Sequence, residues 1–350
     1  MMQNNKPLLT MDLTRRDFLR GSTAVTAALS LGGADMLSNP CFCEPMQLLK
    51  DAKEAAEDPL LLELKEVAIN FTSSPANDMG LPEPEPIWDE PLFGVASGAD
   101  PLWDVFKETA VGSEHWSPRE AFLLAFPEET DVTPEELSVL VWILPQTRRT
   151  NEDNRRQNFY PSERWIRSRW FGESDVNGPL RRLMVEEINS RGIQAMSPGL
   201  LHEFVSGIGS PADPAPISPW SPFGRASTFS ERHAAFAAGL GTFGLSDGLI
   251  TKIGKAHRIG SVVLRATMEP TPRPYTEPYE YCLFFKDASC AMCVSRCPVD
   301  SVRILGRDKE ACLSHLRETT MSHVEEHMGW ENFYGCGLCQ TLVPCEFRIP

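Results

Sequence analysis

Two stretches in the second half of the chain have the apolar spacing of helices that bury one face. These are "LRRLMVEEINSRG" at 180–192 and "SERHAAFAAGL" at 230–240. Their apolar residues recur every three or four positions and so share one side of a helix. Gly192 and Gly239 stand where each pattern stops, as expected of residues that end helices. Both stretches are therefore predicted to be helices.

Two apolar runs rich in β-branched residues predict strands. They are "VLVWIL" at 139–144, which we expect to be buried on both faces, and "IGSVVLRATM" at 259–268. "SPRE" at 117–120 and "TPEE" at 133–136 each combine an N-cap hydroxyl, a proline at the first helical position and a glutamate at the third, the pattern of a capping box. The alternation of helix and strand predicts an α/β (α+β) fold.

The chain is expected to divide into a leader and two domains. "PLLLELKEVAINF" from Pro59 predicts one amphipathic helix, and the prolines that follow it disfavour both helix and central strand. We interpret residues 35–95 as leader and linker. An α/β domain is predicted at 96–275 and a small cysteine-rich domain at 276–350.

Net charge argues against nucleic-acid binding as the main function. The chain has 350 residues, with 48 acidic and 33 basic side chains and a formal charge of −15. Proteins that bind nucleic acid normally present a basic face to the phosphates. Nucleic acid is therefore not an expected partner.

The N-terminus resembles a twin-arginine export signal. "RRDFL" at 15–19 precedes a weakly apolar run at 22–34 that is too short and too interrupted to span a membrane. The alternative is a basic amphipathic helix at the start of a cytosolic protein. We predict a signal peptide over 1–34, the twin-arginine translocase as a partner and a periplasmic location, with membrane association left open. This pathway carries folded proteins, which suits a protein that receives its cofactor before export.

Cysteine placement favours metal binding over disulfides. Eight of the ten cysteines lie between Cys282 and Cys345, whereas a disulfide framework is expected to spread its cysteines along the chain. Cys41 and Cys43 are left without a role.

The cysteine spacing is typical of ferredoxins with two 4Fe–4S clusters. C-x2-C-x3-C-P occurs at 290–298, followed by one cysteine and then by "CGLCQTLVPC" at 336–345. In such motifs the cysteine before the proline binds the neighbouring cluster. The predicted ligand sets are Cys282, Cys290, Cys293 and Cys345 for the first cluster, and Cys297, Cys312, Cys336 and Cys339 for the second.

The first ligand of this motif is open to two interpretations. Asp287 occupies the position of the first ferredoxin cysteine, and Cys282 lies five residues before it. Cys282 is the preferred ligand because it gives all eight distal cysteines a place. Structural zinc is the alternative to clusters, because C-x2-C pairs also make tetrahedral sites.

Two other motifs have ordinary alternatives. Gly239, Gly241 and Gly244 form G-x-G-x-x-G, but a helix leads into it where a dinucleotide site needs a strand. A glycine-lined turn that lets another flat ligand approach the backbone is the preferred interpretation. "HVEEH" at 323–327 matches an inverted zinc-protease motif but is interpreted as a solvated helix face.

Several of these motifs together resemble one family. "SERHAAFAAGLGTFGLSDGLIT" at 230–251, "GKAHRIGSVV" at 254–263 and the paired cysteine motifs are similar to those of corrinoid-dependent reductive dehalogenases and epoxyqueuosine reductases. The resemblance implies a nitroreductase-like α/β domain that binds cobalamin, followed by a ferredoxin-like module that supplies electrons.

The resemblance also implies catalytic residues. Epoxyqueuosine reductases have an aspartate as proton donor ahead of the helix, where this chain has Arg225, which cannot act as an acid at ordinary pH. Dehalogenases of the family use a tyrosine acid supported by a basic residue. Tyr160 and Arg225 are the candidates for these two roles.

The sequence therefore predicts an exported iron–sulfur oxidoreductase that resembles reductive dehalogenases. Two 4Fe–4S clusters would relay electrons from a redox protein or membrane quinol system to a corrinoid, which acts on a small-molecule substrate. One alternative is a ferredoxin-like electron carrier without corrinoid. The other is an epoxyqueuosine reductase acting on transfer RNA.

Overall fold

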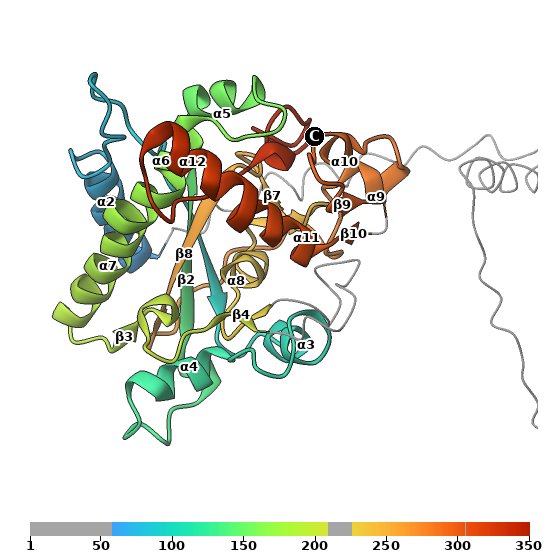
Figure 1. The fold of residues 1–350 in the computed structure, drawn as a ribbon. Coiled ribbons are helices and arrows are strands. Elements are labelled where there is room, and N and C mark those ends of the chain that lie inside the picture. The colour runs from blue at the N-terminus through green and yellow to red at the C-terminus, as the bar shows by residue number, and fades with distance from the viewer. Residues whose placement is uncertain (1–57, 209–225, 305) are drawn as a thin grey trace, which may run out of the picture. The chain divides into compact units, whose positions relative to one another are not determined.

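The computed structural model describes residues 58–208, 226–304 and 306–350. The described residues belong to one compact unit and are coloured from blue to red in Figure 1. The predicted signal peptide at 1–34 lies outside the described residues. Among the described helices, none is long and apolar enough to cross a membrane.

The largest sheet has four antiparallel strands in the order β1-β2-β8-β3. Their bounds are Leu92–Ser97 for β1, Ser138–Pro145 for β2, Ala195–Met196 for β3 and His257–Leu264 for β8. β2 is buried along its whole length and pairs with a strand on each side, as its apolar run predicted. β8 begins two residues before the second predicted strand and covers its first part, to Leu264.

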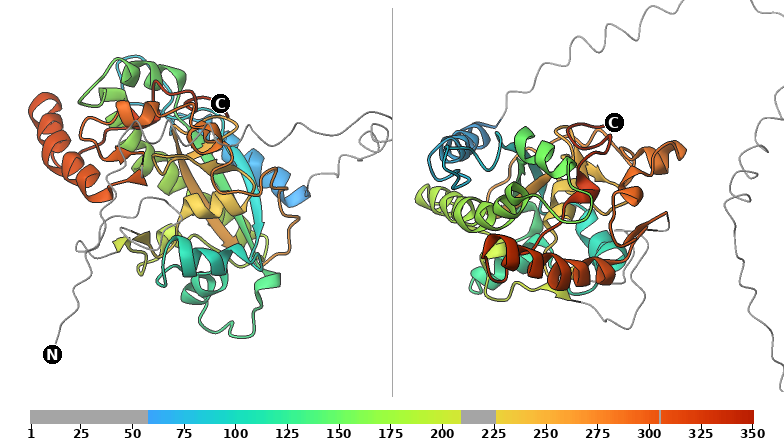
Figure 2. Two further views of the ribbon diagram at one scale, coloured as in Figure 1. Left: turned by 90° about the vertical axis from the view of Figure 1, so that its right-hand side faces the viewer. Right: turned by 45° about the horizontal axis from the view of Figure 1, so that its top comes forward.

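Helices cover both faces of this sheet (Figures 1 and 2). α2 (Pro59–Thr72) and α7 (Gly178–Ser190) share one buried apolar cluster with one face. α4 (Pro118–Ala125) and α8 (Glu231–Ala237) share another with the opposite face. The predicted mixed fold of helices and strands is confirmed.

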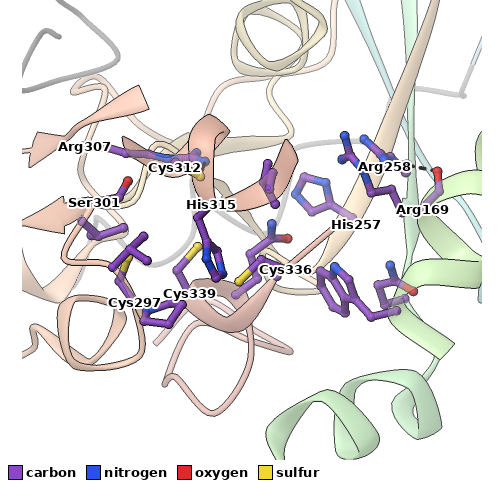
Figure 3. Close-up of a pocket in the computed structure, with 18 residues that line it drawn as sticks. Arg169, His257, Arg258, Cys297, Ser301, Arg307, Cys312, His315, Cys336 and Cys339 are labelled. Carbon is purple, nitrogen blue, oxygen red and sulfur yellow. Dashed lines mark hydrogen bonds between the residues drawn. The ribbon is translucent and has the colours of Figure 1, made fainter. Parts of the chain in front are cut away.

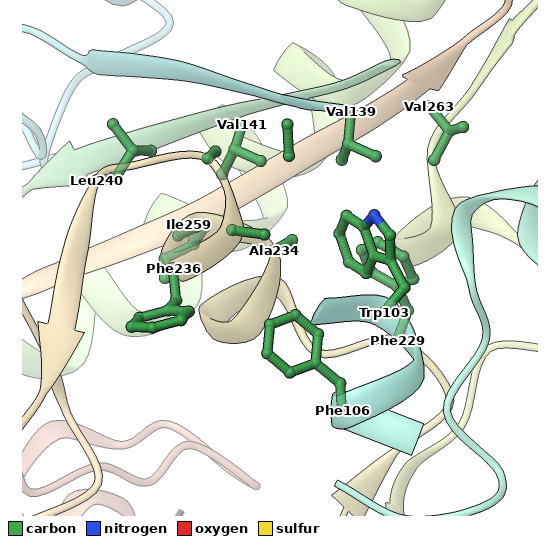
Figure 4. Packing of buried hydrophobic residues seen from close by; sticks show 14 of the residues in the cluster. Trp103, Phe106, Val139, Val141, Phe229, Ala234, Phe236, Leu240, Ile259 and Val263 are labelled. Carbon is green, nitrogen blue, oxygen red and sulfur yellow. The ribbon is translucent and has the colours of Figure 1, made fainter. Parts of the chain in front are cut away.

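Strand β2 shows how its sequence divides these two cores. Leu140, Trp142 and Leu144 join the cluster on the α2 and α7 side. The alternate residues Val139, Val141 and Ile143 join the cluster on the α8 side, because successive side chains of a strand point to opposite faces. Figure 4 shows Val139 and Val141 above Ala234 and Phe236 of α8.

The predicted helix signals agree with the structure, with one difference. Ser117 begins α4 with the predicted capping box. Gly192 and Gly239 follow α7 and α8 with φ of 77° and 75°, the left-handed conformation that favours glycine. Thr133 begins only a short 3-10 helix, η2 (Pro134–Glu136), because β2 starts two residues later.

Shorter elements connect the main ones. They are α3 (Leu102–Val105), η1 (Phe106–Ala110), α5 (Arg148–Arg155), α6 (Glu163–Phe171), η3 (Gly172–Asn177), η4 (Pro198–Leu200), β4 (Ser206–Ile208), β5 (Ala226–Ser227), β6 (Gly241–Phe243) and β7 (Leu249–Thr251).

The interpretation of residues 35–95 as leader and linker is wrong from Asp58 onward. Asp58 caps α2, whose Leu64 and Ala68 are fully buried. Ile87 and Trp88, in the proline-rich stretch, are buried in the same cluster. The prolines exclude regular structure there, but they do not keep apolar side chains out of the core. Residues 35–57 lie outside the described residues.

The segment from 276 to the C-terminus consists of short elements around the cysteines. They are α9 (Leu283–Asp287), α10 (Met292–Ser295), β9 (Val302–Arg303), β10 (Gly306–Arg307), α11 (Lys309–Ser314), η5 (His315–Thr320), α12 (Met321–Met328) and η6 (Leu338–Gln340). Its apolar cluster is small and includes Cys282 and Cys293. The described part of the chain forms one unit, so a domain boundary at 275 stays a prediction.

Candidate functional site

Four cysteines from distant parts of the C-terminal segment line one cavity. They are the predicted first set, Cys282, Cys290, Cys293 and Cys345. Cys282 is buried at the start of α9, whereas Asp287 is exposed and accepts a hydrogen bond from the Ser289 backbone N–H at 2.9 Å. The fold thus brings Cys282 to this cavity, and Asp287 is not among the lining residues.

The other four cysteines line a second cavity of about 130 Å³. They are the predicted second set, Cys297, Cys312, Cys336 and Cys339, drawn with their neighbours in Figure 3. The cysteines that line each cavity are those that the sequence-based assignment placed in one set. In that assignment Cys297, the cysteine before Pro298, belongs to the second set although its motif supplies Cys290 and Cys293 to the first. Ligation of a cluster by these sets stays a prediction.

The chemistry of these thiols fits iron–sulfur clusters. All eight described cysteines are free, so no disulfide uses them. Burial, reinforced by neighbouring thiols, raises the pKa of Cys293 and Cys336 to about 12. Buried thiolates therefore need a compensating positive charge, which the iron of a cluster provides. No three described His, Cys, Asp or Glu side chains form a group that could hold a single metal ion.

The turn between Cys336 and Cys339 is shaped by contacts with the α/β part of the chain. Gly337 has a φ of 67°, and a Cβ there would lie 1.9 Å from the indole of Trp165 in α6. The Asn154 side chain of α5 donates to the backbone carbonyl of Cys336 at 3.2 Å. The second cysteine set is therefore positioned by α5 and α6 as well as by its own segment.

Two cations lie beside the sulfur atoms. Lys255 is 2% exposed, lines the first cysteine cavity and donates its backbone N–H to the Cys345 carbonyl at 3.0 Å. Burial acts to lower the pKa of Lys255, but the thiols of both sets outweigh it and the pKa is raised. Arg307 lines the second cavity and donates from Nη2 to the sulfur of Cys312 at 2.8 Å. Both side chains suit a negatively charged cluster.

A third, polar cavity of about 450 Å³ adjoins the second cysteine cavity. The two share the lining residues Arg169, His257, Arg258, Arg307, Cys339 and Gln340. Further residues of the polar cavity include Glu173, Phe204, Ser227, Phe229, Glu231, Arg232, Leu249 and Lys255. Cationic side chains outnumber the two carboxylates, so the cavity suits an anionic or hydrogen-bonding ligand.

Buried polar atoms without partners occur at the shared wall. Arg169 Nε and Arg307 Nε are buried donors with no hydrogen-bond partner. Burial lowers the pKa of His257 to about 4, so its ring is neutral. Its Nε2 lies 2.9 Å from the Leu249 carbonyl, which makes Nε2 the donor and leaves the unpartnered Nδ1 as an acceptor. These atoms are available to a ligand.

The described lining fits a corrinoid in part. The donors match the amide and phosphate groups at the rim of such a cofactor, and Phe229, Leu249 and Ile259 supply apolar contacts. Residues 209–225, which connect two lining segments, lie outside the described residues.

Of the two predicted catalytic residues, Tyr160 is the one that lies among the described residues. Tyr160 stacks on His323 of α12, with ring centroids 3.8 Å apart, and it is not a lining residue of the polar cavity. Arg225 lies outside the described residues. Their predicted roles remain predictions, and the position of Tyr160 does not favour its role as the acid.

The predicted cofactor-binding glycines have a packing role. A Cβ at Gly239 would lie 2.7 Å from the Pro272 carbonyl oxygen, and one at Gly241 would lie 2.2 Å from that of Ile250. Gly244 lines the first cysteine cavity, and none of the three lines the polar cavity. Gly239 and Gly241 therefore allow close approach of the chain's own backbone, whereas Gly244 packs against the side chain of Ile250. Binding of a flat ligand by these glycines stays a prediction.

The "HVEEH" stretch at 323–327 lies within helix α12. His323 and His327 lie on one face with ring centroids 4.1 Å apart, and Nδ1 of His327 donates to the His323 backbone carbonyl at 3.0 Å. His327 is exposed. The predicted solvated helix face describes this residue, whereas His323 is covered on one side by Tyr160.

Sequence reasoning missed several residues of these sites. Lys255, His257 and Arg258 follow β7 in "GKAHR", within the stretch that carries the family resemblance, yet nothing in their spacing indicates a shared cavity. His315 lines the second cysteine cavity. Its position three residues after Cys312, as C-x-x-H, is a signal that could have identified it.

Comparison with known proteins identifies the export signal. Residues 12–32 match the model of the twin-arginine translocation pathway signal sequence. This confirms the predicted signal and indicates export by that pathway. No curated protein matches the chain.

Solved structures to which the chain is similar include both kinds of protein that the sequence resembles. An epoxyqueuosine reductase from Bacillus subtilis is 18% identical over 82% of this chain and 65% of its own, with a TM-score of 0.41. A catabolic reductive dehalogenase is 15% identical over 74% of this chain and 30% of its own, with a TM-score of 0.43. A further solved structure of a reductive dehalogenase, whose description refers to B12-dependent dehalogenation, is 15% identical over 71% of this chain and 29% of its own, with a TM-score of 0.42. The chain thus spans just under two thirds of the epoxyqueuosine reductase and less than a third of the dehalogenases.

Proposed function

We propose that the protein is an exported iron–sulfur oxidoreductase with two 4Fe–4S clusters. The observation that carries this proposal is the division of eight free cysteines into two sets of four, each lining its own cavity. The cationic side chains beside each set, Lys255 and Arg307, support it because a cluster with four thiolates is negatively charged.

The order of the cavities suggests the direction of electron transfer. The second cysteine cavity shares a wall with the polar cavity through Cys339 and Arg307, whereas none of the first cysteine set lines the polar cavity. Electrons would enter at the first cluster, pass to the second and reach the occupant of the polar cavity one at a time. In this proposal residues 276–350 serve as the electron-transfer module and residues 96–275 as the reducing domain.

The proposed occupant of the polar cavity is a corrinoid. Its support is the family resemblance of residues 230–263, which contribute Glu231, Arg232, Lys255 and His257 to the lining. When bound, such a cofactor supplies two-electron chemistry at cobalt for the reduction of a small molecule. The chain itself would hold the rim of the corrinoid through its cationic side chains and would let electrons reach the corrinoid from the side of the second cysteine cavity.

Metal and cofactor analysis tests this proposal directly. Protein purified and reconstituted without oxygen should contain about eight irons and matching sulfide per chain. Acid extraction followed by absorption spectroscopy should then separate one corrinoid from the cluster bands. Absence of iron, or a content of zinc in its place, would refute the proposal.

The same experiment distinguishes the alternative of a ferredoxin-like electron carrier. Iron at the full amount with no corrinoid, even after incubation with cobalamin, would favour the carrier. Its electron donor would be a redox protein or a membrane quinol system. Transfer-RNA modification is a further alternative. Export of a reporter protein by residues 1–45 would argue against it, provided that changing both Arg15 and Arg16 to lysine abolishes the export.

A further inference from the structure

His315 is the histidine of η5 that lies against the second cysteine set. It is 5% exposed and lines the cavity together with all four cysteines of that set. Figure 3 shows its imidazole directed toward the region between Cys336, Cys339 and Cys297. The first residue of η5 therefore points into the candidate second cluster, three positions after Cys312 on α11.

Neither ring nitrogen of His315 makes a hydrogen bond of full geometry with the described residues, and both are buried. Among those residues, the backbone of Phe159 is the one protein group close enough to interact with the ring in this way. The ring approaches Phe159 edge-on, with centroids 5.4 Å apart. An imidazole has at least one N–H in either protonation state, and a buried donor without a partner costs about 1–3 kcal/mol. Such a group is expected to meet its acceptor in the cavity.

The sulfur atoms of a cluster are suitable acceptors. The four cysteines of the set already complete the usual ligands of a 4Fe–4S cluster, which leaves the histidine as a donor. Hydrogen bonds to cluster sulfur stabilise the reduced, more negative state and so raise the reduction potential. Arg307 contributes in the same direction through its bond to the Cys312 sulfur.

The two cysteine cavities differ in the cationic and histidine side chains that line them. Among the described residues that line the first cavity, Lys255 is the one charged side chain, and no histidine or arginine is present. The second cavity has Arg169, Arg258 and Arg307 in addition to two histidines. The surroundings therefore favour electron density on the second cluster over the first.

We propose that His315 donates a hydrogen bond to a sulfur of the second cluster and thereby raises the reduction potential of that cluster above the potential of the first. This inference rests on the proposed function. It makes the transfer from first to second cluster thermodynamically downhill, and it makes His315 a positioning residue that tunes the relay without binding iron.

Redox titration of His315→Leu, followed by electron paramagnetic resonance, tests the inference. The variant should keep about eight irons, and the potential of one cluster should fall, by about 59 mV if the reduction equilibrium changes tenfold. The matched control is His327→Leu, which removes an exposed histidine of the neighbouring helix and should leave both potentials unchanged. His315→Gln retains an N–H donor and should restore part of the shift.

The cluster that shifts is identified in a Cys282→Ala background, where the signal of the second cluster is expected to remain alone. A shift of that signal supports the inference. Unchanged potentials in His315→Leu would refute it. Loss of about four irons in both His315→Leu and His315→Gln would also refute it, because His315 would then be needed for the cluster to be held at all. Wild-type protein without iron would instead refute the proposed function, so the two failures are distinguishable.

Discussion

The ion pair between Arg155 and Glu346 anchors the C-terminal cysteine loop to α5. Nε of Arg155 donates to both carboxylate oxygens of Glu346, at 3.0 and 2.8 Å. The carboxylate also accepts the Leu342 backbone N–H at 2.7 Å, and the Glu346 side chain is 1% exposed. Glu346 directly follows Cys345, so the pair fixes the backbone beside a predicted cluster ligand. Arg155→Leu is therefore expected to loosen the loop as well as to destabilise the fold.

The size of the effect follows from the burial of the two partners. Removing one partner of a fully buried pair costs about 3–5 kcal/mol, because the other charge is left uncompensated. Arg155 is 35% exposed, and Glu346 keeps its bond to the backbone, so solvent screening reduces the expected cost to about 2 kcal/mol. Burial raises the pKa of Glu346, and Arg155 opposes that rise. Without Arg155 the pKa of Glu346 should rise further, so its carboxyl group takes up a proton more readily. With about 2–4 °C lost per kcal/mol, Tm should fall by roughly 4–8 °C.

Calorimetry and iron analysis of the anaerobic protein measure this prediction. The control is Arg156→Leu, which removes the next residue, a 74% exposed arginine paired with Asp153 on the same helix. This control should change Tm little, because exposed ion pairs contribute about 0–1 kcal/mol. Arg155→Leu should lower Tm and the iron content together. Equal Tm values for the two variants would refute the assigned role of the pair.

Three further predictions follow from single positions. Cys282→Ala should lose one cluster, whereas Asp287→Ala should keep about eight irons; the opposite pattern would make the carboxylate the ligand. Burial lowers the pKa of His115 from 6.5 to about 4, so the unfolded chain takes up the proton first. Stability should then fall by about 3 kcal/mol as pH falls from 6.5 to 4, and urea unfolding of His115→Gln should show a flatter pH dependence. Gly337→Ala would place a Cβ 1.9 Å from an indole and should lower both Tm and iron content. The control is Gly329→Ala. Gly329 has a φ of 71°, and a Cβ there would have nothing within 4 Å, so this variant should cost only about 1–2 kcal/mol of backbone strain. Similar iron loss in the two glycine variants would contradict the packing argument.

The elements predicted from sequence were those with strong local signals. β2 has six apolar residues in a row, and α4 has a complete capping box. β1 was missed because its six residues directly follow a proline-rich stretch, and its burial arises from pairing with β2. The burial of α2 was missed for a similar reason, since its apolar face is matched by α7, more than 100 residues later in the chain.

The cysteine sets could be grouped from spacing because the ferredoxin motif itself encodes which cysteine crosses to the other set. The polar cavity could not be predicted in the same way. Its lining comes from several separate segments, including residues near Arg169, Phe229, Lys255 and Arg307. No local periodicity links these positions, and only the packing of α6, α8 and the C-terminal segment brings them together. The position of Tyr160 against His323 is likewise a tertiary contact.

The first cysteine set has a consequence for how the C-terminal segment holds together. Cys282 and Cys345 lie near the two ends of this segment and line the same cavity. The apolar cluster around them is small and includes Leu245 and Ile250 from outside the segment. In the proposed function, a cluster bound there would close about sixty residues into a ring and restrict the unfolded chain as a long-range cross-link does. The cluster would then act as a cross-link that stabilises a region with too little buried apolar surface to fold stably alone. Assembly of the cluster and acquisition of a transport-competent fold would in that case be one event, completed before the chain leaves the cytoplasm.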